Sequence, residues 1–204
     1  NQFSMGCWMR MSQPGEFGPL IARMDETNAF RGWDVSQAGK KILVHLVNKW
    51  PDNALKVETR DEVLKPGVFQ HVFATYDGSG KAKGVKLYVD GVEVPVKIDK
   101  DVLKASIRSK VPLTIGKRSL NQQLADGRVQ DVRVYERRLA AREIAALANV
   151  APLQYVLGIP VEKRTAEQNA AIFETWLTTR DNVYADRSKQ LAGLNKEQDE
   201  IKAR

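Results

Sequence analysis

Short segments rich in β-branched and aromatic residues recur along residues 1–136, and turn-forming residues separate them. Glycine, proline, aspartate or asparagine interrupts the chain roughly every eight to twelve residues, a spacing typical of antiparallel β-sandwiches. The pattern predicts strands at Phe3–Met11, Leu20–Met24, Phe30–Gln37, Lys41–Asn48, Ala54–Thr59, Phe69–Tyr76, Val85–Val89, Val94–Ile98, Leu113–Ile115 and Gly127–Tyr135.

Two of these segments show how the sheets are covered. The strand at Val85–Val89 alternates apolar and polar residues and ends at Asp90-Gly91, so it should open a hairpin with one buried face. The segment Lys41–Asn48 is apolar on both faces apart from His45. We therefore expect it to be a central strand that is covered on both sides.

Helical spacing replaces the alternation after Tyr135. Leu139–Ala148 has the apolar spacing and composition of a short helix, and Pro152 then marks a connector. Thr165 and Gln168 form a predicted capping box that opens a helix through Leu177. We expect a β-rich domain over residues 1–150 and a helical extension over residues 151–204.

The end of the extension needs a partner. Tyr184, Leu191, Leu194 and Ile201 take approximate heptad positions, but Arg187 shares their seam. A single helix of this kind is marginal in water. We therefore expect the extension to pack on a neighbouring domain or on a second copy of the chain.

Composition excludes several classes of protein. The 204 residues carry a net charge of +7, but the basic residues are scattered, so we predict no nucleic-acid partner. No apolar run is long enough to span a bilayer. The single cysteine, Cys7, and the two histidines, His45 and His71, make no zinc pattern, and Cys7 is expected to be a buried thiol.

Four segments occur in an order that resembles one family. Phe69–Ser79, Gly84–Gly91, Leu113–Arg118 and Asp126–Tyr135 resemble consecutive strands of the concanavalin A-like, laminin G-like jelly-roll domains. The resemblance covers about residues 1–150. It implies a mainly β, antiparallel jelly-roll sandwich with a C-terminal helical extension, and it implies carbohydrate binding as the activity.

The tail adds a second resemblance. Arg164-Thr165, Gln168 and Trp176-Leu177 look like the helical segment that follows such jelly rolls in large exported planctomycete proteins with cytochrome c-like domains. This resemblance implies one module of a multidomain protein in a periplasmic or extracellular location. It also implies that neighbouring domains contact the tail.

A structural calcium ion stays open as a cofactor. The closing strand of the family often has two adjacent acids, whereas here Gln130 precedes a lone Asp131. No Asp/Asn-rich loop of the EF-hand kind is present, and calcium takes six to eight oxygen ligands. We predict no other cofactor and no metal ligand.

Catalysis is not expected. Glycan cleavage needs two facing carboxylates, and sandwich glucanases place theirs in a Glu-x-Asp-x-Glu run that this sequence lacks. The nearest acids, Glu58, Asp61 and Glu62, sit where a strand gives way to a loop. A glycoside hydrolase is therefore the least favoured function.

Trp50 is the candidate platform for a sugar, because it stands in a polar turn after a strand. Lys49, Asp52 and Asn53 flank it as hydrogen-bonding groups, and His45 precedes it on the strand. Two functions follow: a non-catalytic module that binds polysaccharide, or a structural or protein-interaction domain in which Trp50 closes the end of the sandwich or docks the tail.

Overall fold

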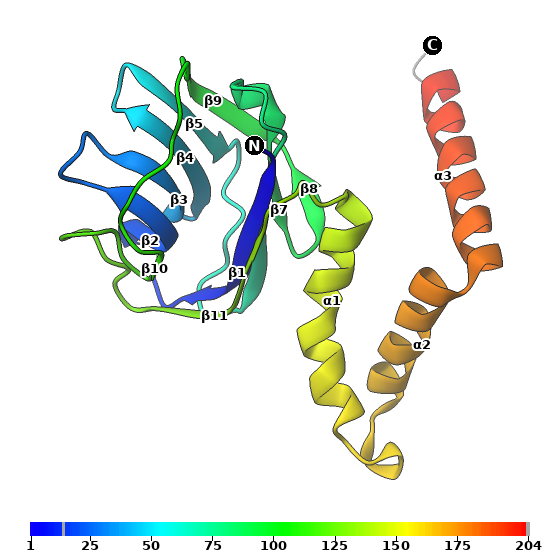
Figure 1. Ribbon diagram of the computed structural model, residues 1–204. Helices are drawn as coiled ribbons and strands as arrows, with labels where there is room; N and C mark the ends of the chain where they lie inside the picture. Colours follow the sequence, from blue (N-terminus) through cyan, green and yellow to red (C-terminus); the bar gives the residue numbers. More distant parts are fainter. Residues whose placement is uncertain (14, 203–204) are drawn as a thin grey trace. The chain divides into compact units, whose positions relative to one another are not determined.

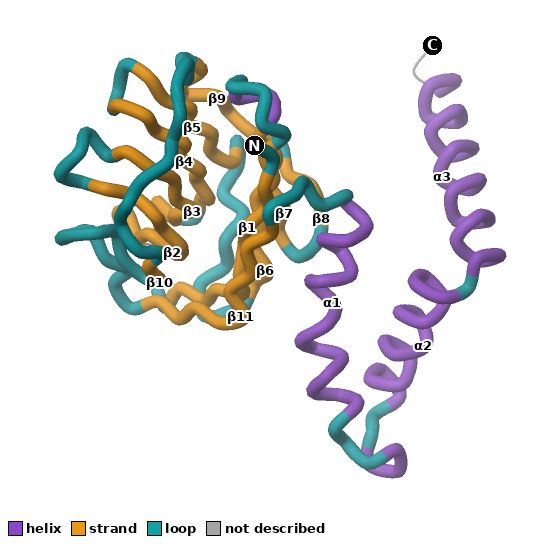
Figure 2. The backbone as a smooth tube through the Cα atoms, viewed as in Figure 1, coloured by secondary structure: helices purple, strands orange, loops and turns teal. Residues whose placement is uncertain are grey.

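The structure, a computed structural model, describes residues 1–13 and 15–202. It contains two compact units, Asn1–Ala145 and Ala146–Arg204. Strands make up most of the first unit and helices make up the second (Figure 1, Figure 2).

The first unit is a sandwich of two antiparallel sheets. The five-stranded sheet has the order β11-β1-β6-β7-β8, with β1 Phe3–Met11, β6 Gln70–Tyr76, β7 Val85–Val89, β8 Val92–Val94 and β11 Gly127–Tyr135. The six-stranded sheet has the order β10-β2-β3-β4-β5-β9, with β2 Gly15–Asp25, β3 Arg31–Gly39, β4 Lys41–Lys49, β5 Asn53–Thr59, β9 Val96–Asp101 and β10 Thr114–Ile115. The predicted antiparallel β-sandwich is confirmed.

The main core lies between the two sheets. On β4 the side chains of Ile42, Val44 and Leu46 belong to this core, while His45 and Val47 are also buried on the opposite face. Because β4 lies between β3 and β5, the prediction of a central strand covered on both sides is confirmed. This second covered face of the six-stranded sheet carries the site described below.

The predicted strand at Val94–Ile98 is wrong, because the chain changes sheets within it. Val94 ends β8 in the five-stranded sheet and Val96 begins β9 in the six-stranded sheet. Pro95 stands between them, where the absence of a backbone N–H ends strand pairing. The Pro95 carbonyl accepts a hydrogen bond from the Arg60 amide at 2.9 Å, which fixes the crossover.

The helices extend further than the sequence pattern predicts. Helix α1 runs from Ala141 to Leu157, so Pro152 lies within it rather than in a connector. Good helix formers on both sides of Pro152 continue the helix across it. Short 3-10 helices lie at Ala82–Gly84 (η1), before β7, and at Val161–Lys163 (η2), after α1.

The other two helices of the second unit are α2, Ala166–Arg180, and α3, Asn182–Lys202. The predicted capping box is confirmed: the Thr165 hydroxyl accepts from the Gln168 amide at 3.2 Å, and the Gln168 side chain accepts from the Thr165 amide at 2.9 Å. None of the helices in residues 1–13 and 15–202 is long and apolar enough to cross a membrane.

Cys7 of β1 and His71 of β6 are both buried in the five-stranded sheet. Cys7 is a free, buried thiol as predicted, and burial, with a smaller effect of Asp131, raises its pKa to about 12. His71 stacks on Phe73 with ring centroids 5.3 Å apart and lies 5.4 Å from the Trp8 ring. Burial lowers the pKa of His71 to about 4 against the opposing charge of nearby acids.

The free energy of unfolding is expected to fall as the pH drops from about 6.5 to 4, because unfolded His71 takes up a proton that folded His71 refuses. The lowered pKa of His71 does not reduce the free energy of unfolding above pH 6.5. Between pH 6.5 and 4, it makes this free energy fall by at most about 1.4 kcal/mol per pH unit. Urea unfolding at several pH values should show a shallower decline for His71→Phe. Equal slopes in both proteins would contradict the assignment.

Candidate functional site

A buried charge network lies on the second covered face of the six-stranded sheet. Asp34 of β3 and His45 of β4 are directly paired in register, so their side chains share this face. His45 Nδ1 lies 2.8 Å from Asp34 Oδ1. Arg118, from the segment after β10, donates from Nε to Asp34 Oδ2 at 2.7 Å, and its Nη2 lies 2.5 Å from the same oxygen in an ion pair. One carboxylate therefore holds both side chains in place.

The protonation of this network follows from its geometry. Burial opposes ionisation of Asp34, but the charges and hydrogen bonds of His45 and Arg118 outweigh it and hold the pKa of Asp34 below its usual 3.8. An ionised carboxylate only accepts hydrogen bonds, so the hydrogen of His45 lies on Nδ1. In the neutral state of this ring, Nε2 is a hydrogen-bond acceptor.

Aromatic rings surround the network. The Trp50 ring lies 5.7 Å from His45 and the Phe17 ring 6.4 Å from it, both edge to face. The Arg118 guanidinium carbon lies 4.7 Å from the centre of Phe17 and 5.6 Å from that of Phe30. These contacts hold Arg118 between two rings as well as on Asp34.

The rings and polar groups enclose a cavity of about 210 Å³. Its lining consists of Phe17, Met24, Phe30, His45, Val47, Trp50, Arg118 and Gln122. Arg118 Nη1 donates to Gln122 Oε1, which leaves the Gln122 amide hydrogens as donors. The volume is below the roughly 300–1,000 Å³ of drug-sized sites, so the cavity suits a single small ring.

Sequence comparison shows the family. Residues 1–145 match the Laminin_G_3 family of the concanavalin A-like lectin/glucanases superfamily. The chain belongs to this superfamily. The resemblance noted from the four strand segments is therefore confirmed, and no curated protein sequence matches the chain.

Solved structures share the concanavalin A-like fold at low sequence identity. The Ruminococcus gnavus IT-sialidase CBM40, solved with alpha2,3 sialyllactose, is 16% identical with a TM-score of 0.58, covering 72% of this chain and 82% of that chain. The binding domain of Paraclostridial Mosquitocidal Protein 1 is 16% identical with a TM-score of 0.56 and 74% of this chain covered. The match spans 37% of the toxin domain, and both likenesses show the fold alone.

The concanavalin A-like unit brings together two of the five sequence-predicted site residues. His45 and Trp50 both line the cavity. Lys49 and Asp52 are exposed and Asn53 is half-buried, and none of the three belongs to the lining. The Asn53 side chain instead accepts from the Lys104 amide at 2.7 Å. The binding roles of all five residues stay predictions.

Sequence reasoning missed Phe17, Phe30, Arg118 and Gln122 of the lining, and it missed Asp34, which holds His45 and Arg118 in place. Asp34 had a usable signal, since an acid in the middle of a β-rich segment needs a buried partner. Arg118 and Gln122 had none, because they reach the sheet from a loop that follows a two-residue strand.

Metal ligation is not visible around the site. Among residues 1–13 and 15–202 no group of three or more His, Cys, Asp or Glu side chains is placed to hold a metal ion. Asp131, the acid relevant to calcium in the family, accepts from Arg133 at 2.8 and 3.1 Å. The possibility of a structural calcium ion is therefore still a prediction.

Proposed function

We propose that the sandwich unit is a non-catalytic carbohydrate-binding module and that it holds a sugar ring in the cavity beside Trp50. One observation carries this proposal: three aromatic side chains and three polar ones converge on a small cavity over a fixed charge network. Carbohydrate rings combine apolar C–H faces with hydroxyl groups, and such a lining supplies partners for both.

Each polar group of the cavity has a defined hydrogen-bonding role. His45 Nε2 accepts when the ring is neutral, the Gln122 amide donates, and Arg118 keeps donors beyond those given to Asp34 and Gln122. A sugar hydroxyl both donates and accepts, so a mixed set of fixed partners suits it. None of the lining residues is an Asp or Glu, which favours binding over hydrolysis by paired carboxylates.

The comparisons support a binding module. The similar structures include a module named CBM40 and a toxin binding domain, which are binding domains rather than catalytic ones by their names. From the same likeness we propose an extracellular or periplasmic location within a larger exported protein. The glycan class remains the subject of the experiment below.

A glycan array probed with the labelled chain tests the proposal. We expect binding to a subset of glycans that share one terminal ring, because a cavity of about 210 Å³ has room for a single small ring. The array should be run with calcium and with a chelator, since dependence on calcium would support the structural ion. Silence on neutral and anionic glycans with a chain that is folded by circular dichroism contradicts the proposal.

A second candidate function is protein interaction through the helical unit, and one observation favours it. Large apolar side chains of this unit are mostly exposed, including Phe173 at 60% and Trp176 at 51%, whose rings stack 6.2 Å apart. Others are Tyr155, Leu157, Val161, Val183, Leu191, Leu194 and Ile201. Such surface is characteristic of a contact with another polypeptide, such as a neighbouring domain of the same protein.

A further inference from the structure

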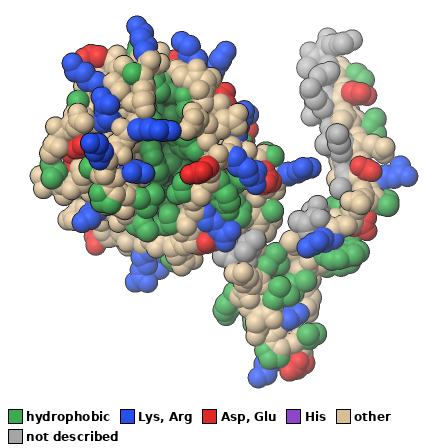
Figure 3. Space-filling view, in the orientation of Figure 1, with side chains coloured by type: hydrophobic (Ala, Val, Ile, Leu, Met, Phe, Trp, Pro, Cys, Tyr) green, Lys and Arg blue, Asp and Glu red, His purple; other side chains and the backbone are tan. Residues whose placement is uncertain are grey.

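A groove of about 1350 Å³ opens at one side of the sandwich unit, away from the residues of the Trp50 cavity. Val134 and Tyr135 line it at the end of β11, the edge strand of the five-stranded sheet. Leu113 lines it just before β10, the edge strand of the other sheet. Figure 3 shows a hollow of hydrophobic side chains in the sandwich unit with Lys and Arg side chains around it.

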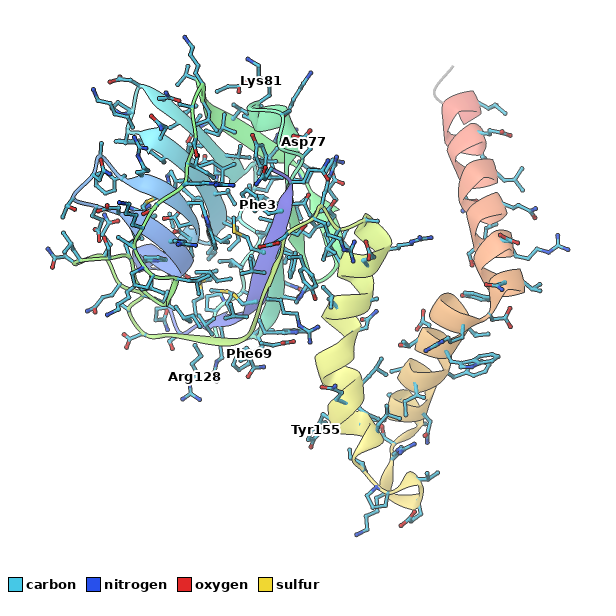
Figure 4. The ribbon with its side chains drawn as sticks, in the orientation of Figure 1. Phe3, Phe69, Asp77, Lys81, Arg128 and Tyr155 are labelled. Atoms are coloured by element: carbon cyan, nitrogen blue, oxygen red, sulfur yellow. The ribbon has the colours of Figure 1, made fainter. Side chains whose placement is uncertain are left out.

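Three aromatic residues form the inner wall of the groove and join the two sheets. Phe3 lies between Trp33 of the six-stranded sheet, 6.2 Å between ring centroids, and Tyr76 of its own sheet, 5.4 Å away. Figure 4 shows Phe3 at the start of β1, beside the space between the sheets. The Tyr76 hydroxyl accepts from the Gly80 amide at 2.6 Å, and burial raises its pKa, so it stays a neutral donor.

The outer wall is the segment of residues 102–113, which is fixed at several points. The Ser106 carbonyl accepts from the Asn48 side chain at 2.6 Å, and the Val111 carbonyl accepts from Arg23 Nε at 3.0 Å. Leu103 and Ile107 pack against the core from this segment. The groove is therefore formed before any partner binds, which lowers the entropy cost of binding.

The charge of the groove is positive. Arg23, Lys104 and Arg108 line it, and no ion pair is found for them in the described part of the chain. Arg137 also lines it but is paired with a glutamate of α1 at 2.6 Å, and Glu136 is the acid of the lining. Three unpaired cations against one acid favour a partner that carries negative charge.

The apolar part of the groove distinguishes between anionic partners. Leu113 and Val134 are 43% and 46% exposed, so the accessible hydrophobic surface is partly aliphatic. Aliphatic side chains gain by covering other apolar side chains, at roughly 25 cal/mol per Å², but they offer a sugar no aromatic face. This composition favours a peptide over a glycan.

An unpaired strand edge also lies at the groove. Strand β11 pairs with β1 on one side, and in the described residues no strand pairs with its other side. The free N–H and C=O groups of an edge strand are a template for adding an extended peptide. Val134 and Tyr135 place the end of this template at the groove.

We propose that the groove binds an extended acidic peptide, which adds to the edge of β11, places an apolar side chain against Val134 and Leu113, and sets its carboxylates beside Lys104 and Arg108. This inference does not rest on the proposed glycan function, because the groove and the Trp50 cavity share no lining residue. The partner would be a segment of another protein or of a neighbouring domain.

Fluorescence anisotropy with three labelled octapeptides tests the inference on the whole chain. We expect an alternating Asp–Val peptide to bind at least about tenfold more tightly than Asp–Ser or Lys–Val peptides, which lack the apolar side chains or reverse the charge. Hydrogen exchange of the β11 amides should slow when the Asp–Val peptide is added, since strand addition protects them.

Variants locate the peptide. Lys104→Gln with Arg108→Gln should weaken Asp–Val binding by about tenfold, while Arg60→Gln with Lys65→Gln, which removes the same charge outside the groove, should change it less than about twofold. Val134 is exposed, so Val134→Asp should weaken binding of the Asp–Val peptide without disturbing the core. Trp50→Ala should leave this binding unchanged. Equal binding of the Asp–Ser peptide, binding of dextran sulfate in place of the peptide, or no binding at all would each overturn the inference.

Discussion

Replacing Asp34 by alanine is expected to lower the free energy of unfolding by about 3–5 kcal/mol, the usual cost of removing one partner from a buried ion pair. Asp34 is fully buried, and Arg118, 6% exposed, forms a hydrogen bond and an ion pair with it. The variant leaves the Arg118 charge and the Nδ1 hydrogen of His45 without their acceptor. Urea unfolding at pH 7 measures the loss.

Asp99→Ala is the matched control for Asp34→Ala. Asp99 of β9 forms ion pairs with Lys56 and Lys97, but its side chain is 20% exposed and Lys97 is largely solvated. Its loss should cost below about 1 kcal/mol. An Asp34→Ala cost no larger than that of Asp99→Ala would show that the network contributes little.

The sign of the pH dependence follows from the lowered pKa of Asp34. The folded protein holds the carboxyl ionised below the ordinary 3.8, so the stabilisation is present above this pH and is lost as the pH falls further. The stability difference between the wild type and Asp34→Ala should therefore shrink below pH 3.8. This pH range lies below the range in which His71 affects stability, so the pH dependence distinguishes the two groups.

The strands were predictable where the local pattern and the tertiary environment agree. β1 and β7 begin and end as predicted. Each lies between turns, and its apolar and polar residues alternate or both of its faces are buried. The error at Val94–Ile98 arose because residues of high β-propensity stand on both sides of Pro95, whereas the chain passes from one sheet to the other at this proline. Propensity describes the backbone state of a residue and carries no information about which sheet it joins.

The site was predictable only in part for the same reason. His45 and Trp50 lie five residues apart at the end of one strand, so local spacing indicated that they share a region. Arg118 bonds Asp34 across 84 residues of sequence, and the loop that carries it has no helical or strand periodicity. Contacts of this range depend on the order of strands in the sheet, which a single sequence does not give.

Trp50→Ala is expected to weaken binding of any glycan found on the array by at least about 30-fold, because a buried aromatic platform typically contributes about 2 kcal/mol or more. Trp50 is half-buried against Met24, Val47 and Ala54 and presents its remaining surface to the cavity. Removing the indole takes away the apolar wall beside His45 and leaves the polar groups facing water. Titration with the array ligand, followed by calorimetry, measures the change.

Controls must separate loss of the platform from loss of the fold, because Trp50 also packs on the sheet. Trp50→Phe keeps an aromatic face and should retain most of the affinity, and Trp176→Ala removes an exposed tryptophan of the helical unit and should change nothing. Lys49→Gln and Asp52→Asn lie outside the cavity lining and should have small effects. Full binding by a folded Trp50→Ala protein would place the sugar elsewhere. A loss of affinity in both Trp50→Ala and Asp52→Asn would instead indicate that the sugar binds at the exposed turn outside the cavity.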